Sequence, residues 1–210
     1  MALQVESDSI NHGERVPHDH AFGVPDGEGK AAPEGGNRSP HLSWSGAPEG
    51  TQSFALIVYD PDVPADFSDA NKDDRTLPED APRADFAHWL LVDISPDVSE
   101  LPEGAGSDGI VPGGKPTGET EHGVTGSNSY TEAMAGDPAM GGTYGGYDGP
   151  FPPFNDERLH HYHFVVHALD VPSLELEGDF TIEDVRAAME GHVLDQGEIV
   201  GEYTLYAERL

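Results

Sequence analysis

Two short stretches of the sequence carry acidic and imidazole side chains at spacings that could do chemistry. The first, VYDPDVPADFSD, places Asp60 and Asp62 on either side of a proline, directly after an apolar run. The second, LHHYHFVVHALD, contains His160 and Tyr162. Because successive side chains of a strand point to opposite faces, His160 and Tyr162 would share one face and could converge on one ligand. Taken alone, however, DPDVP is more typical of a tight turn at a strand end, since aspartate favours turns and proline presets φ.

The elements that must position these residues are predicted to be mainly strands. Apolar bursts at 53–60, 87–94 and 161–169 are each of strand length and rich in aromatic or β-branched residues. Long connections at 65–85 and 104–149 separate them, and glycine is concentrated in the second. The pattern predicts a mainly β fold in which the three bursts are central strands.

One segment near the C-terminus has helical character. Thr181 is typical of a helix N-cap, Asp184 follows at the third position, apolar residues then recur on one face, and Gly191 is a candidate stop. A second short helix is expected at 192–198, followed by a closing strand at 202–210.

The composition indicates one folded domain with a strongly acidic surface. The 210 residues include 40 Asp and Glu against 10 Lys and Arg, a formal net charge of −30. The carboxylates are interspersed with apolar stretches rather than gathered in a block, which favours a folded protein over a disordered tail. Such a surface repels nucleic acid and disfavours anionic membranes. Since salt screens self-repulsion, a halophilic source is inferred.

Absent sequence features narrow the function classes further. The chain has no cysteine, which excludes disulfides, thiol nucleophiles and cysteine-held metals. The N-terminal stretch lacks a basic start and an apolar signal region, and no apolar run reaches membrane-spanning length. A cytoplasmic protein is expected.

Six sequence blocks occur in order along most of the chain. They are SPHLSWSGAPEGTQSFALIVYDPDVP, HWLLVDI, GSNSY, YGGYDGPFPP, LHHYHFVVHALD and AAMEGHVL. In this order they resemble the phosphatidylethanolamine-binding protein (PEBP) family, and specifically its bacterial and archaeal Raf-kinase-inhibitor-like branch. Several blocks in order are far more specific than any single short motif.

The resemblance implies a β-sandwich with a few peripheral helices, including one near the C-terminus. It implies a single domain over 1–210, with insertions at about 65–85 and 131–142, and a small anion pocket at one end without a cofactor. The implied site residues are Asp60, Asp62, His88, Gly149, Pro150, Pro153, His160 and Tyr162.

The residue types fit such a pocket. A protonated imidazole donates a strong hydrogen bond to a phosphate oxygen, and a neighbouring aspartate orients the ring and raises its pKa. Prolines in DPDVP and DGPFPP would stiffen the walls, and Gly149 would permit close backbone approach. We therefore expect Asp60 and Asp62 to orient histidines around a small anionic or phosphate-bearing ligand.

Alternatives from other function classes remain open. His161, His163 and His167 share a strand face and suggest a metal site, but a clear further ligand is missing, so surface histidines are favoured. His122 and His192 belong to no constellation and are expected to be structural or solvated.

An enzyme of the hydrolase type could use the aspartates and histidines of the site for acid–base work. No G-x-S-x-G or H-E-x-x-H motif supports it, so a non-catalytic binding protein is favoured. The resemblance also implies inhibition or regulation of a partner kinase or protease, and leaves a homodimer open. A salt-adapted interaction protein with a vestigial pocket is the third reading.

The acidic composition predicts salt-dependent stability. The melting temperature should rise steeply between low salt and molar KCl, because screening weakens repulsion between like charges. NaCl should act similarly at equal ionic strength. A melting temperature that is flat across this range would contradict the inferred adaptation to salt.

Overall fold

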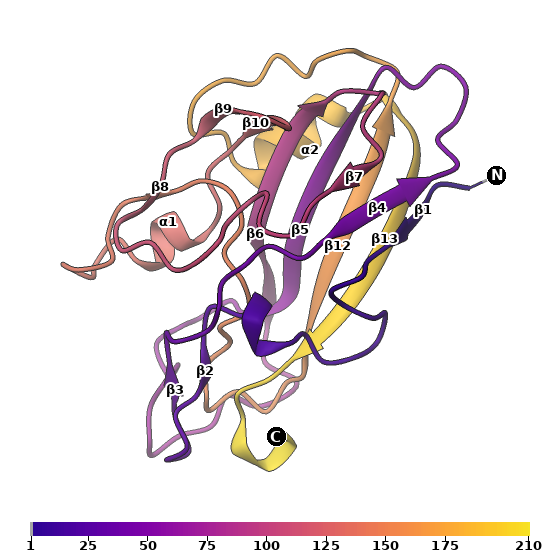
Figure 1. Ribbon diagram of the computed structural model, residues 1–210. Helices are drawn as coiled ribbons and strands as arrows, with labels where there is room; N and C mark the ends of the chain where they lie inside the picture. Colours follow the sequence, from indigo (N-terminus) through magenta and orange to yellow (C-terminus); the bar gives the residue numbers. More distant parts are fainter. Residues whose placement is uncertain (1) are drawn as a thin grey trace.

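A six-stranded antiparallel sheet organises the protein (Figure 1). The computed structural model describes residues 2–210. The strand order is β13-β12-β5-β6-β10-β9. The bounds are β5 Ser53–Pro64, β6 Arg83–Ile94, β9 Gly118–Thr120, β10 Gly123–Thr125, β12 His160–Leu169 and β13 Val193–Tyr203. The three apolar bursts are therefore confirmed as central strands, although β5 and β6 extend further than predicted.

A smaller sheet covers one face of the large one. It consists of β1 (Gln4–Glu6), β4 (Leu42–Ser45) and β7 (Glu100–Leu101) in the order β1-β4-β7. Phe54, Leu56 and Val58 of β5 point toward it and are buried, and Trp44 of β4 meets Phe54 edge-on with ring centroids 5.4 Å apart. The two sheets thus enclose one apolar core, as expected for a mainly β sandwich.

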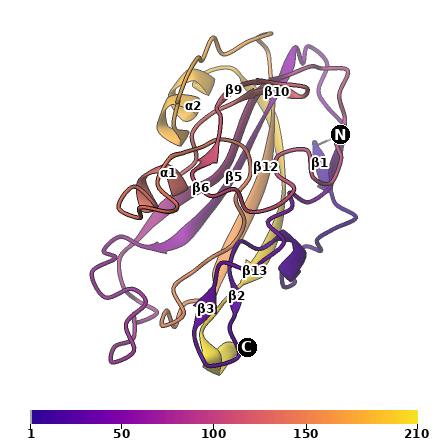
Figure 2. The same cartoon turned by 60° about the vertical axis from the view of Figure 1, so that its left-hand side comes forward.

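Helix α2 (Ile182–Met189) covers the opposite face of the large sheet (Figure 2). Its buried residues Ile182, Val185 and Met189 pack with the alternate side chains of β5 and β6. Thr181 and Asp184 form a capping box, which satisfies amide groups at the helix start. The predicted helix and its N-cap are confirmed.

The expected helix at 192–198 is wrong, because this segment begins β13. Residues 193–203 pair with β12 along nearly its whole length, from Val193 opposite Leu169 to Tyr203 opposite His160. Ile199, Gly201 and Tyr203 are buried in alternation, which is the two-residue period of a strand. The closing strand therefore ends at Tyr203, and a short 3-10 helix, η2 (Ala207–Arg209), follows it.

Short elements fill the connections. They are η1 (His18–His20), β2 (Val24–Pro25), β3 (Ala31–Ala32), β8 (Gly114–Lys115), α1 (Tyr130–Ala133) and β11 (Thr143–Tyr144). The 65–85 connection is held by backbone hydrogen bonds of Leu77 with Asn155 and Glu157, and by the Asn155 side chain. The Asn155 amide donates to the carbonyls of Asp69 (2.8 Å) and Arg75 (2.9 Å), and its oxygen accepts the backbone N–H of Asn71 (2.7 Å).

The 131–142 segment contacts the core only at its two ends. Thr131 Oγ1 accepts the backbone N–H of Tyr144, and Met134 and Met140 pack against the buried Tyr130 and Tyr144. The residues between the two methionines, 135–139, are all exposed. We therefore expect that residues 135–139, but not the whole segment, can be removed without loss of a contact to the core.

Replacing 135–139 by two glycines should leave the fold intact. Closure entropy changes by only about 0.6 kcal/mol per doubling of loop length, so the melting temperature should move by no more than about 4 °C. Thermal unfolding in molar KCl measures it, with Thr131→Ala as a variant that does remove a contact. Insoluble protein after the replacement would show that these exposed residues make an essential contact.

Candidate functional site

A small cavity opens where β12 separates from β5. The pairing of these strands ends at Tyr59 and His163, whereas β5 and β6 remain paired as far as Pro64 and Arg83. The cavity has a volume of about 40 Å³. It is lined by Asp60, Val63, Phe67, Phe86, His88, Tyr130, Phe151, Pro152, Pro153 and Tyr162.

The DPDVP stretch is part of strand β5 and is neither a loop nor a tight turn at the end of the strand. The register shifts between Asp60 and Val63, so the strand is locally irregular there. Within this irregularity the Asp60 carboxylate accepts the backbone N–H of Asp62 at 2.8 Å. Pro61, which has no N–H to donate, suits a place where the ladder is interrupted. The irregular segment directs Asp60 into the cavity and Asp62 away from it.

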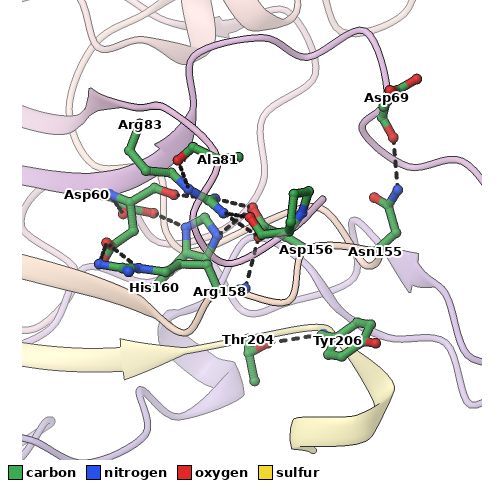
Figure 3. Close-up of polar contacts among 12 residues, drawn as sticks. Asp60, Asp69, Ala81, Arg83, Asn155, Asp156, Arg158, His160, Thr204 and Tyr206 are labelled. Atoms are coloured by element: carbon green, nitrogen blue, oxygen red, sulfur yellow. Dashed lines mark hydrogen bonds and ion pairs between the residues drawn. The ribbon is translucent and has the colours of Figure 1, made fainter. Parts of the chain in front are cut away.

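His160 is held between two carboxylates (Figure 3). Its Nδ1 lies 2.6 Å from Asp60 Oδ2, its Nε2 lies 3.2 Å from Asp156 Oδ2, and the ring is fully buried. Burial lowers the pKa of His160, but the charge of Asp60 and the hydrogen bonds that the ring donates to both carboxylates outweigh it and raise the pKa to about 9. His160 is therefore an imidazolium with both N–H groups occupied, and it orients Asp60 rather than lining the cavity.

Two arginines complete the charge balance of this network (Figure 3). Arg83 binds Asp156 through both terminal nitrogens, at 2.6 and 3.0 Å. Arg158 binds Asp62 at 2.8 Å, and His161 Nδ1 lies 2.7 Å from the same carboxylate. Burial raises the pKa of Asp62, but the bonds from His161 and Arg158 outweigh it and leave the pKa lowered. Each carboxylate of the network thus has a cationic partner.

His88 is the imidazole that lines the cavity. Its Nδ1 donates to the backbone carbonyl of Asp148 at 2.6 Å, and its buried Nε2 has no hydrogen-bonding partner within residues 2–210. Burial lowers the pKa of His88 to about 4, against the opposing effect of the Asp60 charge. At neutral pH the ring is therefore uncharged, and Nε2 offers a lone pair rather than the charge-assisted donor that the sequence predicted.

Aromatic rings frame His88. The rings of Phe86 and Tyr162 each lie 5.1 Å from it, and Tyr130 meets it edge-on at 5.7 Å. Burial, followed by the charge of Asp60, raises the pKa of Tyr162 well above its usual value, so the phenol keeps its proton. The polar side-chain groups that line the cavity are then the Asp60 carboxylate, a neutral imidazole nitrogen and the phenol hydroxyls of Tyr162 and Tyr130, the second of which donates to the Gly149 carbonyl at 2.7 Å.

Of the other predicted site residues, Gly149 and Pro150 lie outside the cavity, whereas Pro153 lines it. A Cβ at Gly149 would lie 2.0 Å from the carbonyl oxygen of His20, so only glycine fits there. The carbonyl of Pro150 accepts the backbone N–H groups of Phe22 and Gly23, both at 3.0 Å. Pro153 forms part of the cavity wall.

The sequence predicted four of the residues that line the cavity and did not identify the others. The predicted residues that line the cavity are Asp60, His88, Pro153 and Tyr162, whereas Asp62, Gly149, Pro150 and His160 do not. Tyr130 and Phe151 were present in the GSNSY and YGGYDGPFPP blocks but were not assigned to the site. Asp156, which pairs with His160, and Arg83, which pairs with Asp156, had no sequence signal.

The histidine row of β12 does not converge on a metal. His161 pairs with Asp62, His163 Nδ1 lies 3.0 Å from Glu198 Oε2, and His167 is buried. Within the described chain no group of three or more histidine or acidic side chains is placed to hold a metal ion. None of the helices in residues 2–210 is long and apolar enough to span a membrane.

A family model described as phosphatidylethanolamine-binding protein matches residues 6–204. The chain belongs to the PEBP family. It is 34% identical over 199 residues to UPF0098 protein YbcL of Escherichia coli, covering 94% of this chain and 82% of the relative. A UPF0098 protein of Methanothermobacter thermautotrophicus is 33% identical over 170 residues, covering 81% and 85%.

A solved PEBP structure shares the fold. The crystal structure of E. coli YbcL, described as a new member of the mammalian PEBP family, matches with a TM-score of 0.69 and 29% identity. The match covers 97% of this chain and 99% of that one. The sandwich and the α2-covered sheet therefore belong to a PEBP fold.

The ion pairs of the buried His160 with Asp60 and Asp156 predict a loss of stability at alkaline pH. Since its pKa is raised from 6.5 to about 9, its contribution is fully present below pH 6.5 and is lost as the pH rises through 9. The loss should be on the order of 3 kcal/mol.

Denaturant unfolding at pH 6 and pH 10 in molar KCl measures this loss. His160→Asn should remove most of the pH dependence and destabilise the protein at pH 6 by about 3–5 kcal/mol, because Asp60 stays buried without its cation and Asp156 keeps only Arg83. His122→Asn, at a histidine without a side-chain partner, serves as the control. Equal pH dependence in wild type and His160→Asn would show that His160 is not the titrating group.

Proposed function

We propose that the cavity binds the phosphate group of a phosphomonoester, or a similar small oxyanion, in a form that carries one acidic proton. The observation that carries this proposal is the buried, unpartnered Nε2 of His88 beside Asp60 and Tyr162. A buried acceptor without a partner costs about 1–3 kcal/mol, and a ligand O–H would recover that cost. The description of the family as phosphatidylethanolamine-binding proteins also supports a phosphate-bearing ligand.

The protonation state of the ligand follows from the charges around the cavity. Asp60 and neutral His88 both accept hydrogen bonds, so a fully ionised phosphate would face acceptors rather than donors. A monoprotonated phosphate can donate its O–H to His88 Nε2 and accept from the Tyr162 hydroxyl. The proton of the complex is then shared between phosphate and imidazole, which replaces the expected preformed imidazolium.

The cavity size limits what is bound inside it. A volume of about 40 Å³ admits a few waters or a small oxyanion. Phe67, which is 52% exposed, lies at the cavity beside Val63 and Phe86. We infer that the oxyanion enters the cavity while an organic substituent rests on this apolar rim.

The side chains favour binding over catalysis. A general base works best with a pKa near the working pH, whereas the pKa of His88 is lowered to about 4 and both N–H groups of His160 are held by carboxylates. Asp60 already accepts bonds at both oxygens. We therefore propose a ligand-binding protein, in which occupancy of the cavity would be the signal for any partner kinase or protease.

The shared proton predicts different pH profiles for phosphate esters and sulfate. Phosphoethanolamine should bind more tightly as the pH falls from 8 to 5, because the doubly ionised phosphomonoester takes up one proton near pH 6. Sulfate has no such proton and should bind only as His88 itself protonates, so its affinity at pH 6 should be at least about tenfold lower. Titration calorimetry in buffers of different ionisation heat also counts the protons taken up.

Two variants test whether His88 is the residue that binds the phosphate group. His88→Ala should weaken phosphoethanolamine binding about ten- to a hundredfold, since one charge-assisted bond contributes about 1.5–3 kcal/mol. His122→Ala, outside the cavity, should leave binding unchanged. Equal affinity for sulfate and phosphoethanolamine across pH 5–8, or unchanged binding in His88→Ala, would refute the proposal.

A further inference from the structure

A second cavity lies on the opposite face of the large sheet, beneath α2. It has a volume of about 160 Å³. Side chains of β5 and β12 form its floor, α2 contributes one wall, and β13 contributes another. The lining residues are Ile57, Tyr59, Val165, His167, Arg186, Met189, Gln196 and Glu198. Since side chains alternate along strands, this cavity is separated by the sheet from the one that contains Asp60 and Tyr162.

His167 is a buried polar side chain, one ring nitrogen of which has no hydrogen-bonding partner among residues 2–210. It is 9% exposed, its ring lines the cavity, and its Nδ1 has no hydrogen bond to any described residue. Burial lowers the pKa of His167 to about 4 against the opposing effect of a hydrogen bond to the Ala55 backbone, and the nearby Arg186 charge also lowers it. The ring is therefore neutral at pH 7, and a ligand atom that pairs with Nδ1 would offset a cost of about 1–3 kcal/mol.

Charges of opposite sign line the cavity on different elements. Arg186 of α2 lies over the Tyr59 ring at 5.2 Å and binds Asp85 through Nη2 at 2.6 Å, so most of its five N–H groups remain available. Glu198 of β13 lies 3.0 Å from His163 Nδ1, and the His163 ring stacks on Tyr59 at 5.1 Å. Ile57, Val165 and Met189 add apolar surface between these charges.

We propose that this cavity binds a small zwitterion of the α-amino-acid type. Arg186 and His167 would take the carboxylate, Glu198 the ammonium group, and the apolar floor a short aliphatic side chain. A ligand without net charge is not repelled by a protein of net charge −30, whereas a simple carboxylate is. The volume is close to that of a cavity that accommodates benzene, about 150 Å³, which suits a ligand of six to eight heavy atoms.

Three probes of matched size test the charge pattern on the full chain. L-alanine carries both charges, propionate only the carboxylate and propylamine only the ammonium group. Titrations followed by the His167 ring signals in NMR should show saturable binding of L-alanine, with propionate and propylamine at least about tenfold weaker. Equal shifts with all three probes, or no saturable shift with L-alanine, would overturn the proposal.

Variants assign each charge to its group. Glu198→Gln, at an exposed position, should weaken L-alanine at least about tenfold and leave propionate unchanged. Arg186→Gln should weaken both L-alanine and propionate and leave propylamine unchanged. Glu202→Gln, on the same strand but outside this cavity, is the matched control, and unchanged His160 signals verify the fold of each variant. Undiminished L-alanine binding in both Glu198→Gln and Arg186→Gln would also overturn the proposal.

Discussion

The buried chain from Asp60 through His160 and Asp156 to Arg83 is the interaction on which the candidate site depends. It lies where β12 leaves β5, a place at which the sheet ladder no longer holds the strands together. Removing one member would leave a buried charge without its partner, and that is far more costly than replacing an exposed pair. The alternation of charge along the chain therefore keeps β5, β12 and the segment before β12 in one arrangement, and the cavity is the space that this arrangement leaves.

The same arrangement drives two histidines to opposite charge states. His160 is cationic because two carboxylates flank it, whereas His88 is neutral because aromatic rings bury it and a backbone carbonyl occupies its Nδ1. Asp60 links the two, since it is bonded to His160 and lies in the cavity that His88 lines. The imidazolium neutralises Asp60 from outside the cavity, and the face presented to a ligand therefore consists of acceptors and two phenols. Recognition at such a face depends on protons that the ligand brings.

Local patterns in the sequence predicted the elements but only part of the site. The capping residues Thr181 and Asp184 and the apolar runs of the central strands are short-range signals, and the structure confirms the elements that they predicted. The helix expected at 192–198 is instead the first part of β13, since the alternation of buried residues begins only near Ile199 and the start of the strand is fixed by pairing with β12. Face alternation correctly grouped His160 with Tyr162, but it could not show that Asp156 takes the second nitrogen of His160. That contact depends on a turn whose geometry no residue pattern specifies.

The acidity of the chain constrains which ligands the two cavities can bind. Among the described residues every lysine and every arginine except Arg15 lies within ion-pair distance of a carboxylate. Arg15 covers the ring of Tyr203 instead. A protein with so few cations, nearly all of them committed, cannot attract a ligand through a surplus of positive charge. The neutral buried imidazoles His88 and His167 each leave one ring nitrogen without a partner among residues 2–210, so in the proposed complexes these rings would contribute hydrogen bonds rather than charge.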